Sequence, residues 1–299
     1  MNIKYECIPC SIHNYIRLVK SNMIPENLQE DILRKLLDFF SRVDYNQSPP
    51  ALGQQLHRLL RKYLHNPDPY QEVKLEFNRR MLERYEEFKK IINDSSHPFL
   101  TAVRLAIAGN VIDFGSFHRL EVMETVERVL KAELARDDSL KLKQEIEKAD
   151  TVLYLGDNAG EIVFDKLLIE TMNHPKVFFA VRGTPIINDI TEQDAKMIGI
   201  DEYAKIVSTG DDAPGILLES CSPEFTKIFH QADVVISKGQ GNLEGLIDVD
   251  KNIFYLLTVK CGLIAEHLGV KEKEFVVFGG SCPHKKNSDM ALSTKERDS

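Results

Sequence analysis

Short apolar runs alternate with helical stretches in the second half of the chain, and this alternation constrains the fold more than any other feature. The runs cover residues 151–155, 177–181, 205–207, 234–236, 253–257 and 275–278. Strands that alternate with helices favour a parallel sheet with helices on both faces. We therefore predict an α/β fold, built as a three-layer α/β/α core around a mostly parallel sheet.

The first half of the chain has a different pattern and is predicted to be helical. Apolar residues recur there at helical spacing, over residues 25–43, 51–64, 69–93, 97–112, 119–135 and 139–149. The change near residue 149 predicts a helical N-terminal domain, residues 1–148, followed by an α/β domain, residues 149–282. Residues 283–299 are polar and are predicted to form a flexible tail.

The overall charge and hydropathy exclude some classes of partner. The 299 residues carry a net charge of -8 without a strong cluster of lysine or arginine, so a nucleic-acid partner is not expected. No apolar run approaches the length of about 18 residues that a membrane span needs, and the N-terminus lacks the pattern of a signal peptide. We expect a cytoplasmic protein without a membrane partner, and the sequence leaves the oligomeric state open.

The run GDNAGE, residues 156–161, follows the first predicted strand and leads into an amphipathic helix. Asp157 and Asn158 therefore stand at the carboxyl end of a strand, where open α/β sheets bind their ligands. Their side chains offer hard oxygen ligands suited to Mg²⁺ or Mn²⁺. The helix that Glu161 opens would present free N–H groups to an anion. This combination predicts a site for metal-bound phosphate.

A second interpretation of the same run stays open. In a plain strand–turn–helix joint, Asp157 and Asn158 would only cap the helix. The run lacks the Lys-Ser/Thr of a P-loop and the glycine spacing of a dinucleotide-binding loop. Capping and metal binding both fit the hexapeptide. The residues that follow the other strands distinguish these two interpretations.

A second pair of one asparagine and one aspartate follows the next predicted strand along the chain. Asn188 and Asp189 come after the strand 177–181, and they would lie at the same edge of the sheet as Asp157. Asp189 could supply a third metal oxygen. The run NDITEQDA also has the pattern of a helix start, in which case the pair would be a second cap.

Two lysines follow the later strands. Lys238 stands in the glycine-rich run SKGQGNLEG, whose exposed backbone N–H groups could cradle a phosphate beside its positive charge. The alternative is an ordinary glycine-rich turn. Lys260 follows the strand 253–257 and would reach the same rim, although most lysines are simply solvated.

The cysteines give a weaker signal. They are five in number, Cys7, Cys10, Cys221, Cys261 and Cys282, and an odd count in an expected cytosolic protein argues against a disulfide framework. The CxxC formed by Cys7 and Cys10 is compatible with a second metal site, to which Cys261 could add a thiolate. A redox pair and simple buried thiols are the alternatives.

One polar pair belongs to the helical half. Asn110 and Asp113 stand three positions apart in the run AGNVIDFG, on one face of a predicted helix. They could face a cleft between the two halves, or they could cap the end of that helix.

Taken in order, the runs AGNVIDFG, GDNAGEIVFDKLL, IINDIT and SKGQGNLE resemble the motifs of the DUF89 family, the damage-control phosphatases. The N-terminal CIPC is similar to the stand-alone prokaryotic branch of that family, and the resemblance extends from Cys7 to about Cys282. It implies a helical N-terminal part on an α/β/α core. It also implies hydrolysis of phosphomonoesters with Mn²⁺, Co²⁺, Ni²⁺ or Mg²⁺.

The resemblance implies roles for single residues as well. The family's metal ligands are matched by Asp157, Asn158 and Asp189. Its phosphate-binding and substrate-contacting positions are matched by Lys238, Gly239, Asn242 and Lys260. Recurrent motif positions, which we include as candidate substrate contacts, are matched by Glu161, Asn110 and Asp113.

These observations together predict a divalent-metal-dependent phosphatase of small phosphorylated metabolites, such as sugar phosphates or related damaged metabolites. A metal on Asp157, Asn158 and Asp189 would polarise the phosphorus, and the two lysines would hold the remaining oxygens. The attacking group would be a metal-oriented water or a carboxylate such as that of Asp157. Two alternatives are an S-adenosylmethionine-dependent carboxyl methyltransferase and a non-catalytic metal- or metabolite-binding protein.

Overall fold

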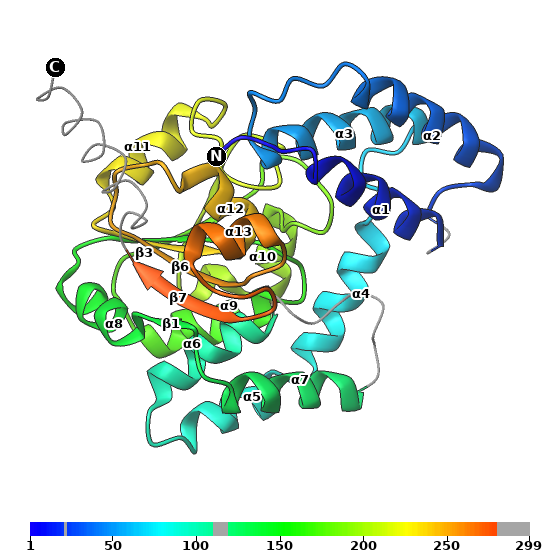
Figure 1. The fold of residues 1–299 in the computed structure, drawn as a ribbon. Helices are drawn as coiled ribbons and strands as arrows, with labels where there is room; N and C mark the ends of the chain where they lie inside the picture. The colour runs from blue at the N-terminus through cyan, green and yellow to red at the C-terminus, as the bar shows by residue number, and fades with distance from the viewer. Residues whose placement is uncertain (21–22, 110–118, 280–299) are drawn as a thin grey trace, which may run out of the picture.

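The computed structural model describes residues 1–20, 23–109 and 119–279 of the chain. Within these residues, seven strands form one sheet in the order β1-β7-β6-β5-β2-β3-β4 (Figure 1). The strands are β1 (Arg136–Asp137), β2 (Val152–Leu155), β3 (Val177–Val181), β4 (Lys205–Ser208), β5 (Val234–Lys238), β6 (Ile253–Thr258) and β7 (Phe275–Gly279). Neighbouring strands run parallel, except that β6 and β7 are antiparallel. The predicted α/β class is confirmed.

Six of these strands coincide with the six apolar runs of the sequence. The exception is β1, a strand of two residues in a segment where the sequence predicts only a break between helices. Arg136 pairs with Val276 and Asp137 with Val277, at the edge of the sheet. A pattern of two polar residues is too short to identify a strand, so only the pairing with β7 defines it.

Side chains of the strands alternate between two hydrophobic clusters. In β2, Val152 and Tyr154 belong to one cluster, whereas Leu153 and Leu155 belong to the other. This follows from the pleat of a strand, which points successive side chains to opposite faces. Each cluster therefore fills the space between one face of the sheet and the helices that cover it.

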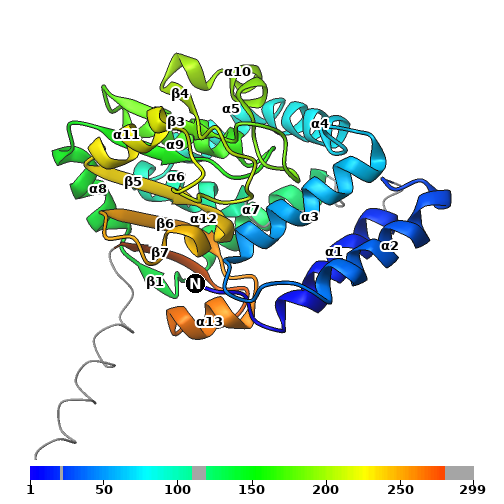
Figure 2. The ribbon, with the colours of Figure 1, turned by 90° about the horizontal axis from the view of Figure 1, so that it is seen from above.

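Helices cover both faces of the sheet (Figures 1 and 2). The helices are α1 (Cys7–Lys20), α2 (Glu26–Phe40), α3 (Pro49–Leu64), α4 (Gln71–Leu82), α5 (Tyr85–Asn93), α6 (Pro98–Gly109), α7 (Arg119–Lys131), α8 (Ser139–Lys148), α9 (Ile162–Met172), α10 (Glu192–Ile198), α11 (Pro223–Gln231), α12 (Gly239–Leu246) and α13 (Gly262–Leu268), with a 3₁₀ turn η1 (Ile200–Glu202). Buried side chains of α4 to α10 join one cluster, and those of α11 to α13 join the other. The three-layer arrangement is therefore as predicted. In the described part of the chain, no helix is long and apolar enough to cross a membrane.

The larger cluster spans both predicted domains. It contains Phe77, Phe88 and Ala106 from the helical half together with Tyr154 and Phe164 from the α/β half. The two halves thus share one continuous core, and helices of the first half form one of the outer layers. The domain boundary near residue 149 stays a prediction from the sequence pattern. The hydrophobic core is continuous across it.

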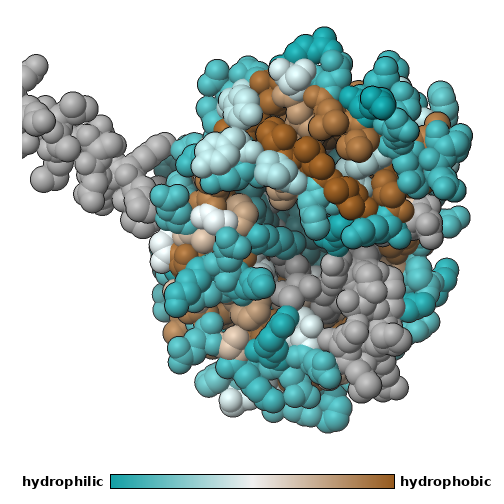
Figure 3. Space-filling model, turned by 45° about the vertical axis from the view of Figure 1, so that its right-hand side comes forward, coloured by the Kyte–Doolittle hydropathy of each residue, from teal (hydrophilic) through white to brown (hydrophobic). Residues whose placement is uncertain are grey.

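The first three helices form a smaller group beside the sheet, as Figure 2 shows. Their own cluster is built from the buried side chains of Tyr15, Ile24, Ile32, Leu36 and Leu60. The helix α1 has no counterpart among the predicted helices, and it places the CxxC pair in its first turn. Apolar side chains gather in a band on the face shown in Figure 3, the side on which these helices lie.

The order of the strands reverses at one point. The chain runs from β2 through β3 to β4, and then returns to the other side of β2 with β5 and β6. Such a reversal opens a crevice outside the carboxyl ends of the two strands that flank it. The run GDNAGE follows β2, and SKGQGN begins at the end of β5. Both motifs therefore lie at this crevice.

Candidate active site

Two loops at the carboxyl edge of the sheet are joined by main-chain hydrogen bonds. The loop after β2 carries Asp157 and Asn158, and the loop after β3 carries Asp189. The N–H of Ile190 donates to the carbonyl oxygen of Asp157 at 3.0 Å. Asn158 and Asp189 face each other in an isolated antiparallel bridge. This pairing brings together the three residues that the sequence suggests as metal ligands.

The carboxylate of Asp157 lies against the first residue of α12. That residue is Gly239, which has a φ of +77°, and a Cβ built on it would overlap the Asp157 carboxylate. Glycine alone combines this backbone conformation with the absence of a side chain. The carboxylate therefore lies between the ends of β2 and β5, in the crevice at the reversal of strand order.

Burial raises the pKa values of acidic side chains in the crevice. Burial raises the pKa of Asp157 to about 8, and the charges of Asp189 and Glu161 add to this rise, while Lys260 and Arg182 oppose it. Burial also raises the pKa of Asp189, against the effect of Arg182. A proton, a positively charged side chain such as Arg182 or a bound cation can stabilise buried carboxylates that repel one another.

Arg182 is a member of this site that the sequence does not reveal. It directly follows β3, and its side chain is buried. Its Nε donates to Asp189 Oδ2 at 2.7 Å, and its Nη2 donates to Asn242 Oδ1 at 2.9 Å. Nη2 also lies 3.8 Å from Asp157 Oδ1. The guanidinium thus fixes Asp189 and connects the loops after β2 and β3 with α12.

Asn242 joins the ends of the two strands that flank the crevice. Its Nδ2 donates to the carbonyl oxygen of Lys238 at 2.7 Å and to that of Gly156 at 3.2 Å. Its Oδ1 accepts the hydrogen bond from Arg182. All three hydrogen bonds of this buried amide go to the protein, so Asn242 braces the site in this structure, and substrate binding by its side chain stays a prediction.

Lys238 lies behind the crevice, in the layer of α6 and α9. Its side chain is completely buried, and Nζ donates to Glu161 Oε1 at 2.6 Å, to Asp165 Oδ1 at 2.6 Å and to the carbonyl oxygen of Ala106 at 2.9 Å. Burial acts to lower the pKa of Lys238, but the charges of Asp165 and Glu161 outweigh it and raise that pKa. A lysine has three N–H donors, and these bonds use all of them. Phosphate binding by this ammonium stays a prediction, and it would require one of these bonds to break.

Lys260 lies on the exposed rim after β6. Its backbone N–H donates to Gln240 Oε1 at 2.9 Å, which ties this rim to α12. Its positive charge opposes the rise that burial causes in the pKa of Asp157. Lys260 is therefore near the crevice and accessible to solvent, and its contact with a phosphate stays a prediction.

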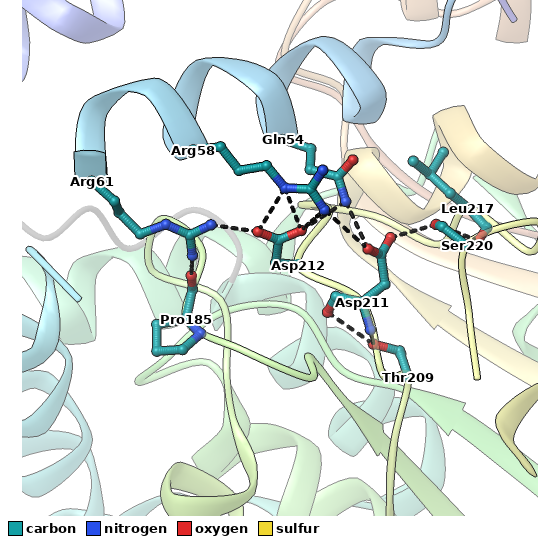
Figure 4. Close-up of polar contacts among 9 residues, drawn as sticks. All are labelled: Gln54, Arg58, Arg61, Pro185, Thr209, Asp211, Asp212, Leu217 and Ser220. Carbon is teal, nitrogen blue, oxygen red and sulfur yellow. Dashed lines mark hydrogen bonds and ion pairs between the residues drawn. The ribbon is translucent and has the colours of Figure 1, made fainter. Parts of the chain in front are cut away.

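The helix α3 bonds to the loops after β3 and β4 (Figure 4). Asp212, in the loop after β4, accepts hydrogen bonds from Arg58, from Arg61 and from Gln54. Arg61 also donates to the carbonyl oxygen of Pro185, in the loop that carries Asp189. The N-terminal helices therefore reach the site through α3, and no sequence pattern indicates this link.

The side chains of the crevice suit a hard divalent cation in their chemistry. Among the described residues, no group of three or more His, Cys, Asp or Glu side chains is arranged to hold a metal ion. A metal here would therefore need the amide oxygen of Asn158 in addition to carboxylate oxygens of Asp157 and Asp189. Such an all-oxygen set is typical of Mg²⁺ and Mn²⁺ sites.

The remaining predicted site residues are two polar residues of the helical half and the cysteines. Asn110 and Asp113 lie outside the described residues. Burial raises the pKa of both Cys10 and Cys261, and the charge of Glu244 adds to the rise in each. Cys261 Sγ accepts a hydrogen bond from Gln240 at 3.4 Å. A metal site on the CxxC pair stays a prediction.

The comparison with known families decides the relationship. The model of the damage-control phosphatase ARMT1-like domain matches residues 3–276. The chain belongs to this family. The family resemblance inferred from the four motifs is thereby confirmed, and so is the enzyme class, a phosphatase.

Individual members of the family agree over nearly the whole chain. A damage-control phosphatase of Pyrococcus horikoshii is 37% identical over 289 residues, which are 92% of this chain and 97% of that protein. A damage-control phosphatase of Archaeoglobus fulgidus is 33% identical over 260 residues, 83% of this chain and 90% of that protein. The crystal structure of a DUF89 family protein from Pyrococcus horikoshii superposes with a TM-score of 0.86 at 34% identity and covers 93% of this chain and 99% of that one.

Proposed function

We propose that this member of the damage-control phosphatase family hydrolyses phosphomonoesters of small metabolites with the help of a divalent metal at the crevice between β2 and β5. The observation that carries the proposal is the convergence of Asp157, Asn158 and Asp189 through the pairing of two loops. Sugar phosphates or related damaged metabolites are the proposed substrate class. Mn²⁺, Co²⁺, Ni²⁺ and Mg²⁺ are the proposed metals, and the cytoplasm is the proposed location.

The proposed metal ligands are Asp157, Asn158 and Asp189. A divalent cation bound there would withdraw charge from a phosphate oxygen and make the phosphorus more electrophilic. The pair of buried carboxylates supports this assignment, because burial raises the pKa of Asp157 and repulsion by Asp189 adds to that rise. A cation would relieve that repulsion.

The residues of the chain itself would hold the phosphate. The helix α12 begins at Gly239, next to the Asp157 carboxylate, and the first N–H groups of a helix have no partner within the helix. These N–H groups and the exposed Lys260 are the proposed contacts of the phosphate oxygens. Arg182 would keep Asp189 in place while the substrate binds, since it donates to that carboxylate and is itself buried.

A phosphatase screen with a metal series tests the proposal. The full chain should hydrolyse small phosphomonoesters with Mn²⁺, Co²⁺, Ni²⁺ or Mg²⁺ and lose that activity with a chelator. Asp157→Asn should remove metal-stimulated activity and leave the fold intact. Turnover that is equal in the presence and absence of the chelator would contradict the metal site, and binding of S-adenosylmethionine without hydrolysis would favour the methyltransferase alternative.

The CxxC pair is proposed as a second, separate metal site. Cys7 and Cys10 lie in the first turn of α1, where two thiols three positions apart face the same side. Two thiolates need additional ligands to complete a tetrahedral site. Metal analysis of the purified protein tests this: the Cys7→Ser/Cys10→Ser variant should lose one equivalent of metal, and an unchanged metal content would contradict the second site.

A further inference from the structure

Glu161 connects the buried ammonium of Lys238 to the crevice. One oxygen of its carboxylate, Oε1, accepts from Lys238 Nζ at 2.6 Å, and the other, Oε2, accepts from Asn158 Nδ2 at 2.9 Å. The side chains of Lys238 and Glu161 are both completely buried. A buried carboxylate held at both oxygens has little freedom to rotate, so the position of the ammonium sets that of the carboxylate.

The amide of Asn158 is oriented by the groups around it. Its Nδ2 donates to Glu161 Oε2 and also to Asp157 Oδ2 at 2.6 Å, and its Oδ1 accepts from Asn188 Nδ2 at 2.8 Å. Glu161 Oε2 accepts from the Asn158 amide N–H, so an amide rotated by 180° would place its oxygen against this carboxylate oxygen in place of the donor. Glu161 therefore helps to decide which side of the amide carries the oxygen.

We propose that Lys238 is a positioning residue of the metal site, which acts through Glu161 on the orientation of Asn158. The inference rests on the proposed metal site, because the oxygen of Asn158 is one of the proposed ligands. It assigns to Lys238 a role that differs from direct phosphate binding. The three hydrogen bonds of Nζ to the protein, and the complete burial of the side chain, support the positioning role.

Asp165 completes the surroundings of the ammonium without touching the crevice. Its Oδ1 accepts from both Lys238 and the Tyr154 hydroxyl, while Oδ2 has no hydrogen-bond partner among the described residues. Removal of Lys238 alone would leave two buried carboxylates without their counter-charge, which can prevent folding. The double substitution Lys238→Met/Asp165→Asn removes one charge of each sign and leaves Glu161 in place, so it is the better test.

The experiment measures Mn²⁺ binding by calorimetry on the full chain, with inhibition by inorganic phosphate as a second readout. Lys238→Met/Asp165→Asn should weaken Mn²⁺ binding at least tenfold in a protein that still unfolds cooperatively. The matched control is Lys166→Met, which removes a buried lysine of α9 whose ammonium bonds to the carbonyl oxygen of Ile198. This control should change Mn²⁺ affinity less than threefold.

Glu161→Gln provides an independent variant that keeps the Lys238–Asp165 pair. A glutamine has one acceptor end and one donor end, so it cannot accept from Lys238 and Asn158 at the same time. It should weaken Mn²⁺ binding at least tenfold, and combining it with the double substitution should add little. If the double variant does not fold, this variant still decides.

The inference would be overturned by Mn²⁺ affinity within threefold of the wild type in a folded Glu161→Gln or double variant. If phosphate inhibition is also weakened tenfold in that double variant, Lys238 would be a phosphate ligand. A wild type that binds Mn²⁺ but hydrolyses no phosphomonoester would contradict the proposed function alone, because the binding measurement does not depend on turnover.

Discussion

The Asp157 carboxylate lies directly over the Cα of Gly239, where the loop after β2 meets the start of α12. Asp157 comes from a loop that pairs with the segment around Asp189, whereas Gly239 begins α12. The carboxylate can lie this close to the start of α12 because the residue at position 239 has no side chain.

Gly239→Ala should disrupt the crevice. The new Cβ would overlap the Asp157 carboxylate, and alanine would also have to adopt a φ of +77°. We expect a loss of Mn²⁺-stimulated phosphatase activity of at least a hundredfold and a fall in the free energy of unfolding of about 1–3 kcal/mol. Kinetics and urea denaturation measure the two effects.

The control is Gly269→Ala. Gly269 ends α13 with a φ of +67°, but a Cβ there would meet open space. This variant carries the backbone strain alone and should lose stability without losing activity. Equal activity losses in the two variants would show that strain, and not contact with Asp157, is responsible.

Arg182→Lys should loosen Asp189. Lysine keeps the positive charge, but it cannot make the two hydrogen bonds that Arg182 makes to Asp189 and Asn242 from separate nitrogens of a planar group. We expect a roughly tenfold weaker Mn²⁺ affinity and a loss of about 1–3 kcal/mol in unfolding free energy. Arg34→Lys, at an exposed pair with Glu30, serves as the control and should change neither quantity measurably. An Arg182→Lys variant with wild-type Mn²⁺ affinity would contradict the role given to the guanidinium.

Arg61→Ala should separate α3 from the loops that it holds. Arg61 bonds to the Asp212 carboxylate and to the carbonyl oxygen of Pro185 (Figure 4). Since Asp212 keeps its bonds to Arg58 and Gln54, we expect a moderate loss of about 1–3 kcal/mol, measured by urea denaturation. Exchange of the loop amides with deuterium should be faster. The exposed Arg42, paired with Asp38 on α2, is the matched control, and an equal loss in Arg42→Ala would show that α3 has no special role.

Metal stabilisation should increase with pH. Burial raises the pKa of Asp157 to about 8, with Asp189 and Glu161 adding to it. A carboxyl whose pKa is higher in the folded state binds a proton there more readily than in the unfolded chain, so its contribution to stability is present at low pH and is lost as the pH rises toward 8. A divalent cation competes with that proton and replaces its effect.

We therefore expect the rise in melting temperature caused by a fixed Mn²⁺ concentration to be larger at pH 8 than at pH 5.5. Saturation at a hundred times the dissociation constant corresponds to roughly 2.7 kcal/mol of stabilisation. Thermal unfolding at the two pH values, with and without Mn²⁺, measures the effect. Asp157→Asn should abolish the difference, and an equal Mn²⁺ effect at both pH values in the wild type would rule out competition at Asp157.

Most of the sheet was predictable from the sequence because its central strands are buried on both faces. Runs such as 253–257 are apolar throughout and are separated by helical stretches, so each run identifies one strand. The helix α1 is different, since Tyr15 is its one buried side chain and the rest of its surface is mixed. The edge strand β1 depends on pairing with Val276 and Val277, which no local pattern can show.

In the site, the sequence could predict only those residues that come shortly after the end of a strand. Asp157 and Asp189 could be placed together because parallel strands end at the same edge. The surroundings of Lys238 could not, because Glu161 and Asp165 lie 77 and 73 positions away in sequence and the contact forms only when α9 packs behind the sheet. Arg182 was missed for the same reason, since its partners are brought to it by the fold.

The pairing of the loops after β2 and β3 also affects which sequence changes relatives of this chain can accept. Its hydrogen bonds are donated by the backbone N–H groups of Ala159 and Ile190 to the carbonyl oxygens of Asn188 and Asp157. Main-chain bonds of this kind do not depend on the identity of the side chain, except that proline has no N–H to donate. Substitutions of the intervening loop residues should therefore leave Asp157 and Asp189 aligned. Proline at either donor position should be selected against.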